Sequence, residues 1–334
     1  MSSPAVLAGD VGGTHARFAR VRPGDGPVVL EEVRTYDVPG SASLEALVRG
    51  YLADAPGPVA GAAIGIAAPV VGGRARPINL PWAVDEAEVA RATGGSAHLL
   101  NDLLANAWGI GELADDGLEE LQPDRVGGGG NRAVCSAGTG LGVAGIVAIG
   151  ESWQPFASEG GHIDFGPRDE DEDALLLWLR AQHPEWGHVS AERVVSGPGI
   201  HAIWRFATGT GRATATPELL AAVAAGDPSA AIADAALADA DVSAVLALEL
   251  FCRAYGATAG NLALSMLATG GVYIGGGIAP RILPILRRGG FLDAFHAKGR
   301  YDGLLEHVAV RVILDDLCAL RGAGRYALTR LDDA

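Results

Sequence analysis

Lysine is almost absent from this chain of 334 residues. Lys298 is the only lysine, and arginine supplies the other basic residues. A Walker-type phosphate loop needs the sequence Gly-Lys-Ser/Thr, whereas Lys298 is followed by Gly299. If the protein binds a nucleotide, it must therefore do so without the lysine of such a loop.

Cysteine and net positive charge are also lacking. Cys135, Cys252 and Cys318 lie far apart and are odd in number, which argues against a disulfide framework and a cysteine-rich zinc site. There are 25 basic and 40 acidic residues, a formal net charge of -15. A nucleic-acid or anionic membrane surface is therefore not expected, and a polyanionic substrate would need a local basic patch or a metal ion.

Export and membrane signals are missing too. The first ten residues, MSSPAVLAGD, have neither the basic start nor the long apolar run of a signal peptide. The most apolar long segment, Val242 to Ala268, contains Glu249, Arg253 and Asn261, so we expect a buried helix rather than a membrane span. Together with the unpaired cysteines, these features predict a cytoplasmic protein that binds no membrane.

Glycine, in contrast, is abundant, with 48 residues. Two glycine clusters stand in the same local pattern of strand, turn and strand: GDVGGT (9–14) and AGTGLG (137–142). They form a weak internal repeat, which suggests two alike halves and a cleft with a phosphate loop from each side.

The first glycine cluster has the residue types of a phosphate site. The backbone N–H groups of Gly12, Gly13 and Thr14 can face an anion, and Asp10 at the strand end can hold a cation. An ordinary tight hairpin is the alternative. The second glycine hairpin favours the phosphate interpretation.

Other segments predict the surrounding elements. We expect a helix with a serine start over 43–53, a buried strand over 59–69, and a strand ending at Asn101-Asp102 that leads into a helix. Residues 112–131 turn acidic and then glycine-rich, which indicates a boundary or an exposed loop. Residues 241–268 predict one long helix, or two helices broken near Gly256 or Gly260.

The stretch SEGGHIDF (158–165) places Glu159, His162 and Asp164 within six residues. The spacing alone allows a metal site, an acid–base pair or a grip on a polar ligand. A helical Glu-x-x-His metal motif is disfavoured because Gly160 and Gly161 make a helix unlikely. A zinc site with cysteine ligands is disfavoured because no cysteine stands between residues 135 and 252.

Six motifs in order carry a family resemblance: LAGDVGGTHARFA, LLNDLLANAWGI, AGTGLGVA, SEGGHIDFGP, ERVVSGPGI and GGVYIGGGI. With FLDAFHAKGRY near the C-terminus, they cover nearly the whole chain, and the sequence resembles the bacterial glucokinases of the actin-like ATPase and sugar kinase group. The resemblance implies a two-domain α/β fold of actin-like (ribonuclease H-like) type with an interdomain cleft. It also implies ATP-dependent phosphorylation of glucose by a homodimer. We expect a smaller domain of residues 1–112 plus about 312–334, and a larger one of 113–311.

The resemblance assigns the acceptor site. Asp102 matches the catalytic base, which accepts the proton of the attacking hydroxyl; a helix N-cap is the alternative role. Asn101, Glu159, His162 and Glu192 match sugar-binding residues. A carboxylate and a neutral imidazole can together accept from and donate to sugar hydroxyls. Glu192 could instead form a surface ion pair with Arg193.

The resemblance also assigns the donor site, with ATP and Mg²⁺ as cofactors. Gly138, Thr139 and Gly140 would contact the phosphates, as would Gly12, Gly13 and Thr14. Asp10 would hold Mg²⁺ directly or through water. Gly275, Gly276 and Gly277 would approach the adenosine, with close strand–helix packing as the alternative.

Some residues depart from the family pattern or stay open. His15 stands where many relatives have Asn, and Leu103 and Leu104 replace an acidic residue expected after the Leu-Asn-Asp motif. Asn79 could touch the substrate or cap a loop, and Asp164 is expected to brace His162 or its loop. The alternative functions are a kinase for another hexose, a kinase with a non-ATP donor, and a non-catalytic sugar sensor.

Overall fold

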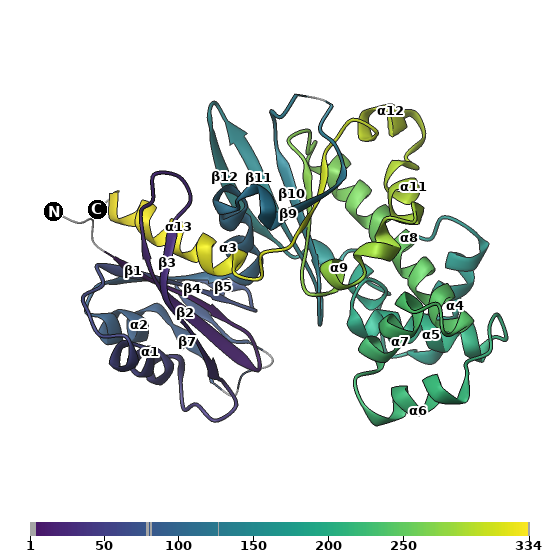
Figure 1. Ribbon diagram of the computed structural model, residues 1–334, viewed down its shortest axis with the longest axis horizontal. Helices are drawn as coiled ribbons and strands as arrows, with labels where there is room; N and C mark the ends of the chain where they lie inside the picture. The colour runs from purple at the N-terminus through teal and green to yellow at the C-terminus, as the bar shows by residue number, and fades with distance from the viewer. Residues whose placement is uncertain (1–4, 78–79, 81, 126, 333–334) are drawn as a thin grey trace. The chain divides into compact units, whose positions relative to one another are not determined.

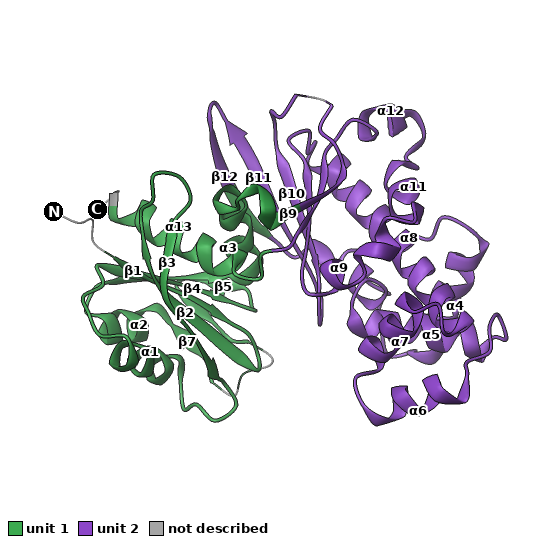
Figure 2. Cartoon of the chain, in the orientation of Figure 1, with its two compact units in different colours: residues 1–118, 155–157, 315–334 green, residues 119–154, 158–314 purple. Residues whose placement is uncertain are grey.

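The computed structural model describes residues 5–77, 80, 82–125 and 127–332 (Figure 1). Asn79 lies outside the described residues. The chain divides into two compact units: unit 1 comprises residues 1–118, 155–157 and 315–334, and unit 2 comprises 119–154 and 158–314 (Figure 2). The C-terminal segment thus returns to the unit that contains the N-terminus.

Unit 1 is built on a five-stranded sheet in the order β3-β2-β1-β4-β8. Its strands are β1 (Val6–Val11), β2 (His15–Arg22), β3 (Val29–Asp37), β4 (Gly61–Ile66) and β8 (Ser96–Asn101). Strand β1 pairs antiparallel with β2 and parallel with β4, which in turn is parallel to β8. A small sheet contains β5 (Val70–Val71), β6 (Arg74–Ala75) and β7 (Val84–Asp85).

Helices cover both faces of this sheet. Helices α1 (Leu44–Asp54) and α2 (Glu86–Thr93) share one apolar core with it, and α13 (Cys318–Asp332) and α3 (Asp102–Gly109) contribute to another (Figure 1). The 3-10 turns η1 (Ile110–Glu112) and η2 (Asp115–Gly117) follow α3. The serine start of α1 is confirmed, because the Ser43 side chain accepts a hydrogen bond from the N–H of Ala46.

Unit 2 contains a six-stranded sheet in the order β12-β11-β10-β13-β14-β9. Its strands are β9 (Leu118–Gln122), β10 (Arg132–Ala137), β11 (Leu141–Ile149), β12 (Ser152–Ser158), β13 (Val272–Gly275) and β14 (Val310–Ile313). The expectation of a boundary or loop over 112–131 is only partly right. The boundary between the units falls there, but β9 is a strand of this sheet.

The helices of unit 2 surround one large core. They are α4 (Glu170–Gln182), α5 (Gly197–Gly209), α6 (Pro217–Ala225), α7 (Pro228–Leu237), α8 (Val242–Ser265), α9 (Ile278–Arg281), α10 (Leu283–Leu286), α11 (Gly290–His296) and α12 (Asp302–Leu305). The 3-10 turns are η3 (Gly160–His162), η4 (Ala191–Arg193) and η5 (Gly299–Tyr301).

Helix α8 is one unbroken helix of 24 residues. By length and composition alone it could cross a membrane, but 72% of its most apolar window is buried inside the protein. Its glycines allow close contact rather than a break: a Cβ on Gly256 would lie 1.9 Å from the carbonyl oxygen of Phe291. The prediction of a buried helix is therefore confirmed.

The internal repeat is visible in the sheets. In each unit a glycine turn joins two antiparallel strands, β1–β2 or β10–β11. The first strand of each pair then lies parallel to a later strand, β4 or β13. That strand is followed in the sheet by another parallel one, β8 or β14. The carboxyl ends of these parallel strands are where ligands commonly bind in α/β sheets.

Candidate active site

The first glycine hairpin joins β1 to β2. The N–H of Gly12 donates to the carbonyl of His15 over 3.0 Å, and the carbonyl of Thr14 accepts from the N–H of Val38 over 2.9 Å. The N–H of Gly12 is used to close the turn. It is therefore not available to bind an anion, contrary to the prediction. Among the described residues, the N–H groups of Gly13 and Thr14 make no hydrogen bond.

Asp10 lies at the end of β1, where burial raises the pKa of its carboxyl group. Nearby Arg17 acts in the opposite direction, and Asp316 adds to the increase. Arg17 and Asp316 themselves form an ion pair of 2.9 Å. A bound cation beside Asp10 would favour the ionised carboxylate. The described residues contain no cluster of three metal-ligating side chains.

Asn101 and Asp102 stand where β8 ends and α3 begins. The helix cap is Asn101, whose Oδ1 accepts from the N–H groups of Leu103 at 2.9 Å and Leu104 at 3.2 Å. The capping role considered for Asp102 thus belongs to its neighbour. Asp102 is the first helical residue and is half-buried, at a helix N-terminus that stabilises a negative charge.

The second glycine hairpin, residues 137–141, joins β10 to β11 and is held from several sides. The N–H of Gly138 donates to the carbonyl of Gly140 over 2.8 Å, so this N–H is also used in closing the turn. The carbonyl of Gly138 accepts from the N–H of Gly197 over 2.8 Å. The Oε2 atom of Glu192 accepts from the N–H of Leu141 over 3.0 Å.

A cavity of about 430 Å³ lies beside this hairpin, entirely within unit 2. Gly138, Thr139 and Gly277, three of the predicted donor residues, line it. Gly275 and Gly276 pack closely against β10. A Cβ on Gly275 would lie 2.3 Å from Ser136 Oγ, and one on Gly276 would lie 2.1 Å from the carbonyl oxygen of Ala137.

Several residues of this cavity were missed by the sequence analysis. The cavity is also lined by His201, Asp227, Ser229 and Arg281. Asp227 caps α7 through the N–H groups of Ser229 and Ala230, and Ser229 Oγ donates to the carbonyl of Gly197 over 2.7 Å. The sequence Asp-Pro-Ser is a recognisable helix start, but it contains no sign that this helix borders a ligand cavity.

Glu159 precedes a single 3-10 turn, and His162 is the last residue of that turn. The two residues do not lie on an α-helix, as the two glycines between them predict. Glu159 Oε2 lies 3.9 Å from His162 Nε2, and each side chain is 58% exposed. Both side chains can therefore reach a ligand from one turn.

The two glycines of this turn pack closely against the second hairpin. A Cβ on Gly161 would lie 1.8 Å from the carbonyl oxygen of Leu141, and one on Gly160 would lie 3.1 Å from a methyl group of Val143. Glycine is required at position 161 by this backbone contact. The predicted sugar-binding turn and the predicted phosphate hairpin are thus adjacent in unit 2.

Among the described residues, Asp164 forms no hydrogen bond with His162; it braces the loop through another histidine. Its Oδ1 lies 2.6 Å from Nδ1 of His188. A β-bridge joins Asp164 to Ser190, and the N–H of Ala191 donates to the carbonyl of Ile163. The loop that carries Glu159 and His162 is therefore joined to the segment that carries Glu192.

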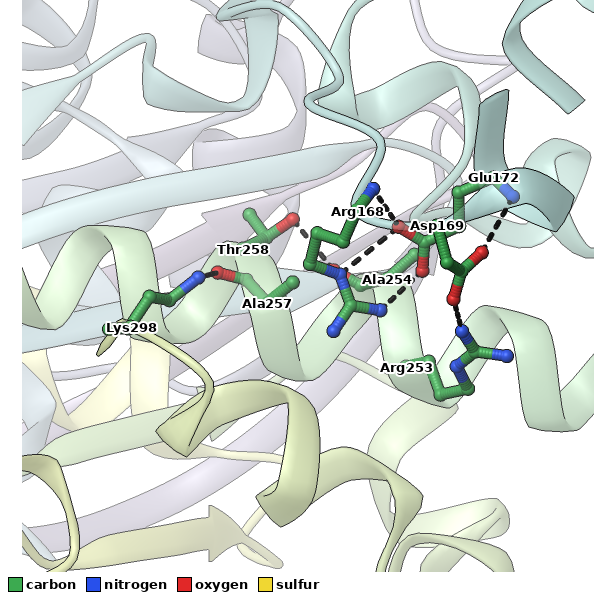
Figure 3. A network of polar contacts seen from close by, with 8 residues as sticks. All are labelled: Arg168, Asp169, Glu172, Arg253, Ala254, Ala257, Thr258 and Lys298. Atoms are coloured by element: carbon green, nitrogen blue, oxygen red, sulfur yellow. Dashed lines mark hydrogen bonds and ion pairs between the residues drawn. The ribbon is translucent and has the colours of Figure 1, made fainter. Parts of the chain in front are cut away.

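A polar network anchors the chain just after this loop (Figure 3). The side chain of Glu172 is buried and accepts from the backbone N–H and the guanidinium of Arg168. Asp169 caps α4 and pairs with Arg253 of α8. The single lysine, Lys298, donates from Nζ to the carbonyl of Ala257 over 3.0 Å. These contacts hold α4 and the 298 segment against α8.

Comparison with solved structures defines the class of protein. The structure is similar to that of a glucokinase from an Antarctic psychrotroph, with a TM-score of 0.85 and 31% identity, over 97% of this chain and 99% of that one. It is also similar to a ROK family glucokinase from Streptomyces griseus, solved in complex with glucose and AMPPNP. The TM-score is 0.67 at 21% identity, over 97% of this chain and 99% of that one, a likeness of fold alone. The fold is that of the two-domain sugar kinases.

Sequence comparison narrows this class to one family. The family model described as Glucokinase matches residues 7–330. The glucokinase of Tolumonas auensis is 39% identical over 328 residues, which are 98% of each chain. The chain belongs to the glucokinase family, and the resemblance carried by the six motifs is confirmed.

Proposed function

We propose that this enzyme transfers the γ-phosphoryl group of ATP to the 6-hydroxyl of glucose, with Asp102 as the general base. The observation that carries the proposal is the contact between the Glu159–His162 turn and the second glycine hairpin. Through Gly161, a turn fit for sugar hydroxyls lies against a hairpin that lines a cavity of nucleotide size.

We assign the acceptor sugar to the residues that the family resemblance gives. In unit 2, Glu159 and His162 offer one carboxylate and one imidazole from the same turn. Glu192 offers a second carboxylate. The resemblance adds Asn101 and Asp102. Because the Oδ1 of Asn101 caps α3, its amide NH₂ is the group that we assign to a sugar oxygen.

Asp102 acts on the hydroxyl that attacks. The 6-oxygen forms a bond to the γ-phosphorus while the bond between that phosphorus and the bridging oxygen of ADP breaks, and the hydroxyl proton passes to the Asp102 carboxylate. Phosphoryl transfer needs mainly positioning and charge stabilisation, so an oriented carboxylate is a sufficient base.

The donor phosphates are assigned to backbone N–H groups rather than to a lysine. Gly13, Thr14, Thr139 and Gly140 carry the N–H groups that the two hairpins leave without a recorded partner among the described residues. Asp10 would hold Mg²⁺ directly or through water, and the ion would supply positive charge to the phosphates.

A coupled assay across sugars and donors tests the proposal. We expect turnover with glucose and ATP that depends on Mg²⁺. No turnover with glucose and a clear rate with fructose or N-acetylmannosamine would reject glucose as the acceptor, and turnover only with another donor would reject ATP.

We also propose a homodimer, as the family resemblance implies. Light scattering on the purified protein should give the mass of two chains. The mass of one chain at concentrations used for the assay would reject this state.

A further inference from the structure

We propose that Glu192 is a positioning residue for the donor hairpin as well as a sugar ligand, so that one carboxylate couples sugar binding to ATP binding. The sugar half of this inference rests on the proposed function. The hairpin half rests on contacts within unit 2 alone.

The two oxygens of the Glu192 carboxylate have different surroundings. Oε2 accepts the N–H of Leu141, the residue that begins β11 directly after the glycine turn. Among the described residues, no hydrogen bond to Oε1 is formed. One oxygen can therefore fix the hairpin while the other accepts from a sugar hydroxyl.

Glu192 supports the hairpin beside the cavity rather than inside it. The hairpin lines the cavity with Gly138 and Thr139, whereas Glu192 contacts the following residues. A Cβ on Gly140 would lie 2.5 Å from Glu192 Oε2. The carboxylate therefore fills the place of a side chain at position 140, and a bound phosphate would not compete with it for the cavity.

The segment that carries Glu192 is itself held in place, and it contacts the hairpin at both of the hairpin's ends. Its carbonyl accepts from Ser196 Oγ over 2.7 Å, and Ser196 is fully buried and caps α5. One residue later, the N–H of Gly197 donates to the carbonyl of Gly138. Residues 192–197 thus hold the hairpin at Gly138 and at Leu141, so a shift of Glu192 changes the shape of the turn between them.

Leu141 contacts both Glu192 and the proposed sugar-binding turn. Its N–H binds Glu192, and its carbonyl oxygen lies against Gly161 of the sugar-binding turn. A sugar that engages Glu159, His162 and Glu192 would immobilise both neighbours of Leu141. The hairpin would then lose less freedom when ATP binds, which is positive coupling between the two substrates.

The test uses Gly140→Ala, because the structure offers it as a selective probe. The added methyl group would meet only Glu192, at 2.5 Å to Oε2 and 3.4 Å to Cδ, and the Glu192 side chain can move aside. The backbone of Gly140 is not in the left-handed region, so alanine is not strained there. Gly140→Ala therefore displaces the carboxylate without removing it. Gly209→Ala, at an exposed glycine of α5 with open space around it, is the matched control.

The first measurement is the Kd of AMPPNP, with Mg²⁺ and without sugar, by calorimetry. We expect Gly140→Ala and Glu192→Ala each to raise this Kd about 5-fold, which corresponds to one hydrogen bond of about 1 kcal/mol. In the double variant the two effects should not add, because Gly140→Ala has nothing to displace once Glu192 is shortened. Glu192→Gln, which keeps an acceptor oxygen for Leu141, should restore most of the affinity.

The second measurement is the ratio of the AMPPNP Kd values without and with saturating glucose. We expect a ratio above one in the unmodified enzyme and a ratio near one in Gly140→Ala and Glu192→Ala. An AMPPNP Kd within twofold of the unmodified value in Gly140→Ala would overturn the positioning role. The positioning role would also be overturned if adding Gly140→Ala to Glu192→Ala weakened AMPPNP binding as much as Gly140→Ala does alone. An unchanged glucose ratio in both variants would overturn the coupling.

These readouts are separate from the proposed function. Failure of the unmodified enzyme to phosphorylate glucose would reject glucose as acceptor, whereas AMPPNP binding without sugar still decides whether Glu192 positions the hairpin.

Discussion

Each of the two glycine hairpins joins a pair of antiparallel strands, but different contacts hold them in place. Around the first, Gly12 bonds to His15 and Thr14 to Val38, so its recorded bonds are to neighbouring strand ends. The second is held at Gly138 by Gly197, at Leu141 by Glu192, and from below by Gly161. The described contacts thus join the second hairpin to two other segments of its unit, and the first hairpin to the strands beside it.

The difference matches the chemistry that we assign to each unit. Unit 2 carries the cavity that we assign to the nucleotide and the turn that we assign to the sugar, and both roles need a fixed shape. Unit 1 carries Asp102 and Asp10, whose carboxylates act on groups that the substrates bring. If this contrast is correct, changes in unit 1 should reduce the rate of reaction, and changes in unit 2 should reduce binding or stability.

The largest effect is expected from Asp102→Ala, which removes the base from unit 1 and leaves the contacts of unit 2 intact. We expect kcat to fall by about 10²–10⁴-fold, the usual loss for an oriented general base, while glucose binding persists in part. Steady-state kinetics and glucose calorimetry measure both quantities. Asp102→Asn should behave like the alanine variant, and near-normal turnover in either variant would refute the assignment.

A smaller effect is expected on stability, and it should differ between the two hairpins. Gly161→Ala forces a methyl group into the carbonyl of Leu141 and should destabilise the protein by about 1–3 kcal/mol, as overpacking does. In Gly12→Ala the new Cβ would lie 3.7 Å from the carbonyl oxygen of His15, an ordinary contact. Thermal denaturation of both variants compares them directly, and a Tm of Gly161→Ala no lower than that of Gly12→Ala would contradict the comparison.

His162→Ala should mainly weaken sugar binding. Loss of one hydrogen bond of about 0.5–1.5 kcal/mol predicts that the KM for glucose rises by up to about 10-fold, with a lesser change in kcat. His188→Ala is the comparison in the same region, because it loosens the loop that carries His162 without removing a proposed sugar ligand. It removes an exposed pair with Asp164, worth about 1 kcal/mol or less. An unchanged glucose KM in His162→Ala would count against the histidine as a sugar ligand.

The smallest effect concerns Lys298, which belongs to the network of Figure 3 and not to either hairpin. Burial, together with nearby Arg168, lowers its pKa from 10.5 to about 8, and Glu172 acts in the opposite direction. Between pH 8 and 10.5 the unfolded chain therefore binds more protons at this residue than the folded chain, so its contribution makes stability rise with pH. Because Lys298 is only half-buried, the rise should be modest.

Denaturation at several pH values, compared with Lys298→Met, isolates this contribution. The difference between the two proteins should grow in favour of the unmodified one from about pH 8 to 10.5. Lys298→Arg, which keeps its charge throughout, should show no such rise. A difference that stays flat across this range would show that Lys298 titrates normally.

The sequence predicts the parts of this fold that depend on neighbouring residues. Alternation and glycine turns predict both hairpins, and the serine before residue 44 predicts the start of α1. The pair Asn101-Asp102 shows the limit, because both side chains can cap a helix and only the backbone geometry places Asn101 at the cap. The six motifs predict the family because their order extends over nearly the whole chain.

Contacts between residues far apart in the chain could not be predicted from the sequence. Glu192 and Leu141 are 51 residues apart, and the bond between them depends on how η4 lies against β11. The same holds for Asp227 and Ser229, which border the cavity only because α7 lies beside α5 and the hairpin. The pairing of Asp164 with His188 likewise depends on a β-bridge between distant segments.

The return of the C-terminal helix to unit 1 has a consequence for the order of synthesis. Leu320, Ala323 and Ala327 of α13 form part of the core beneath β1 and β4, and Gly322 lets this helix contact α3 so closely that a Cβ there would lie 1.8 Å from the carbonyl of Ala105. A ribosome must therefore complete all of unit 2 before the first unit can close its core. Residues 1–118 are made first, but their core can close only after the last segment of the chain, 315–334, has been made.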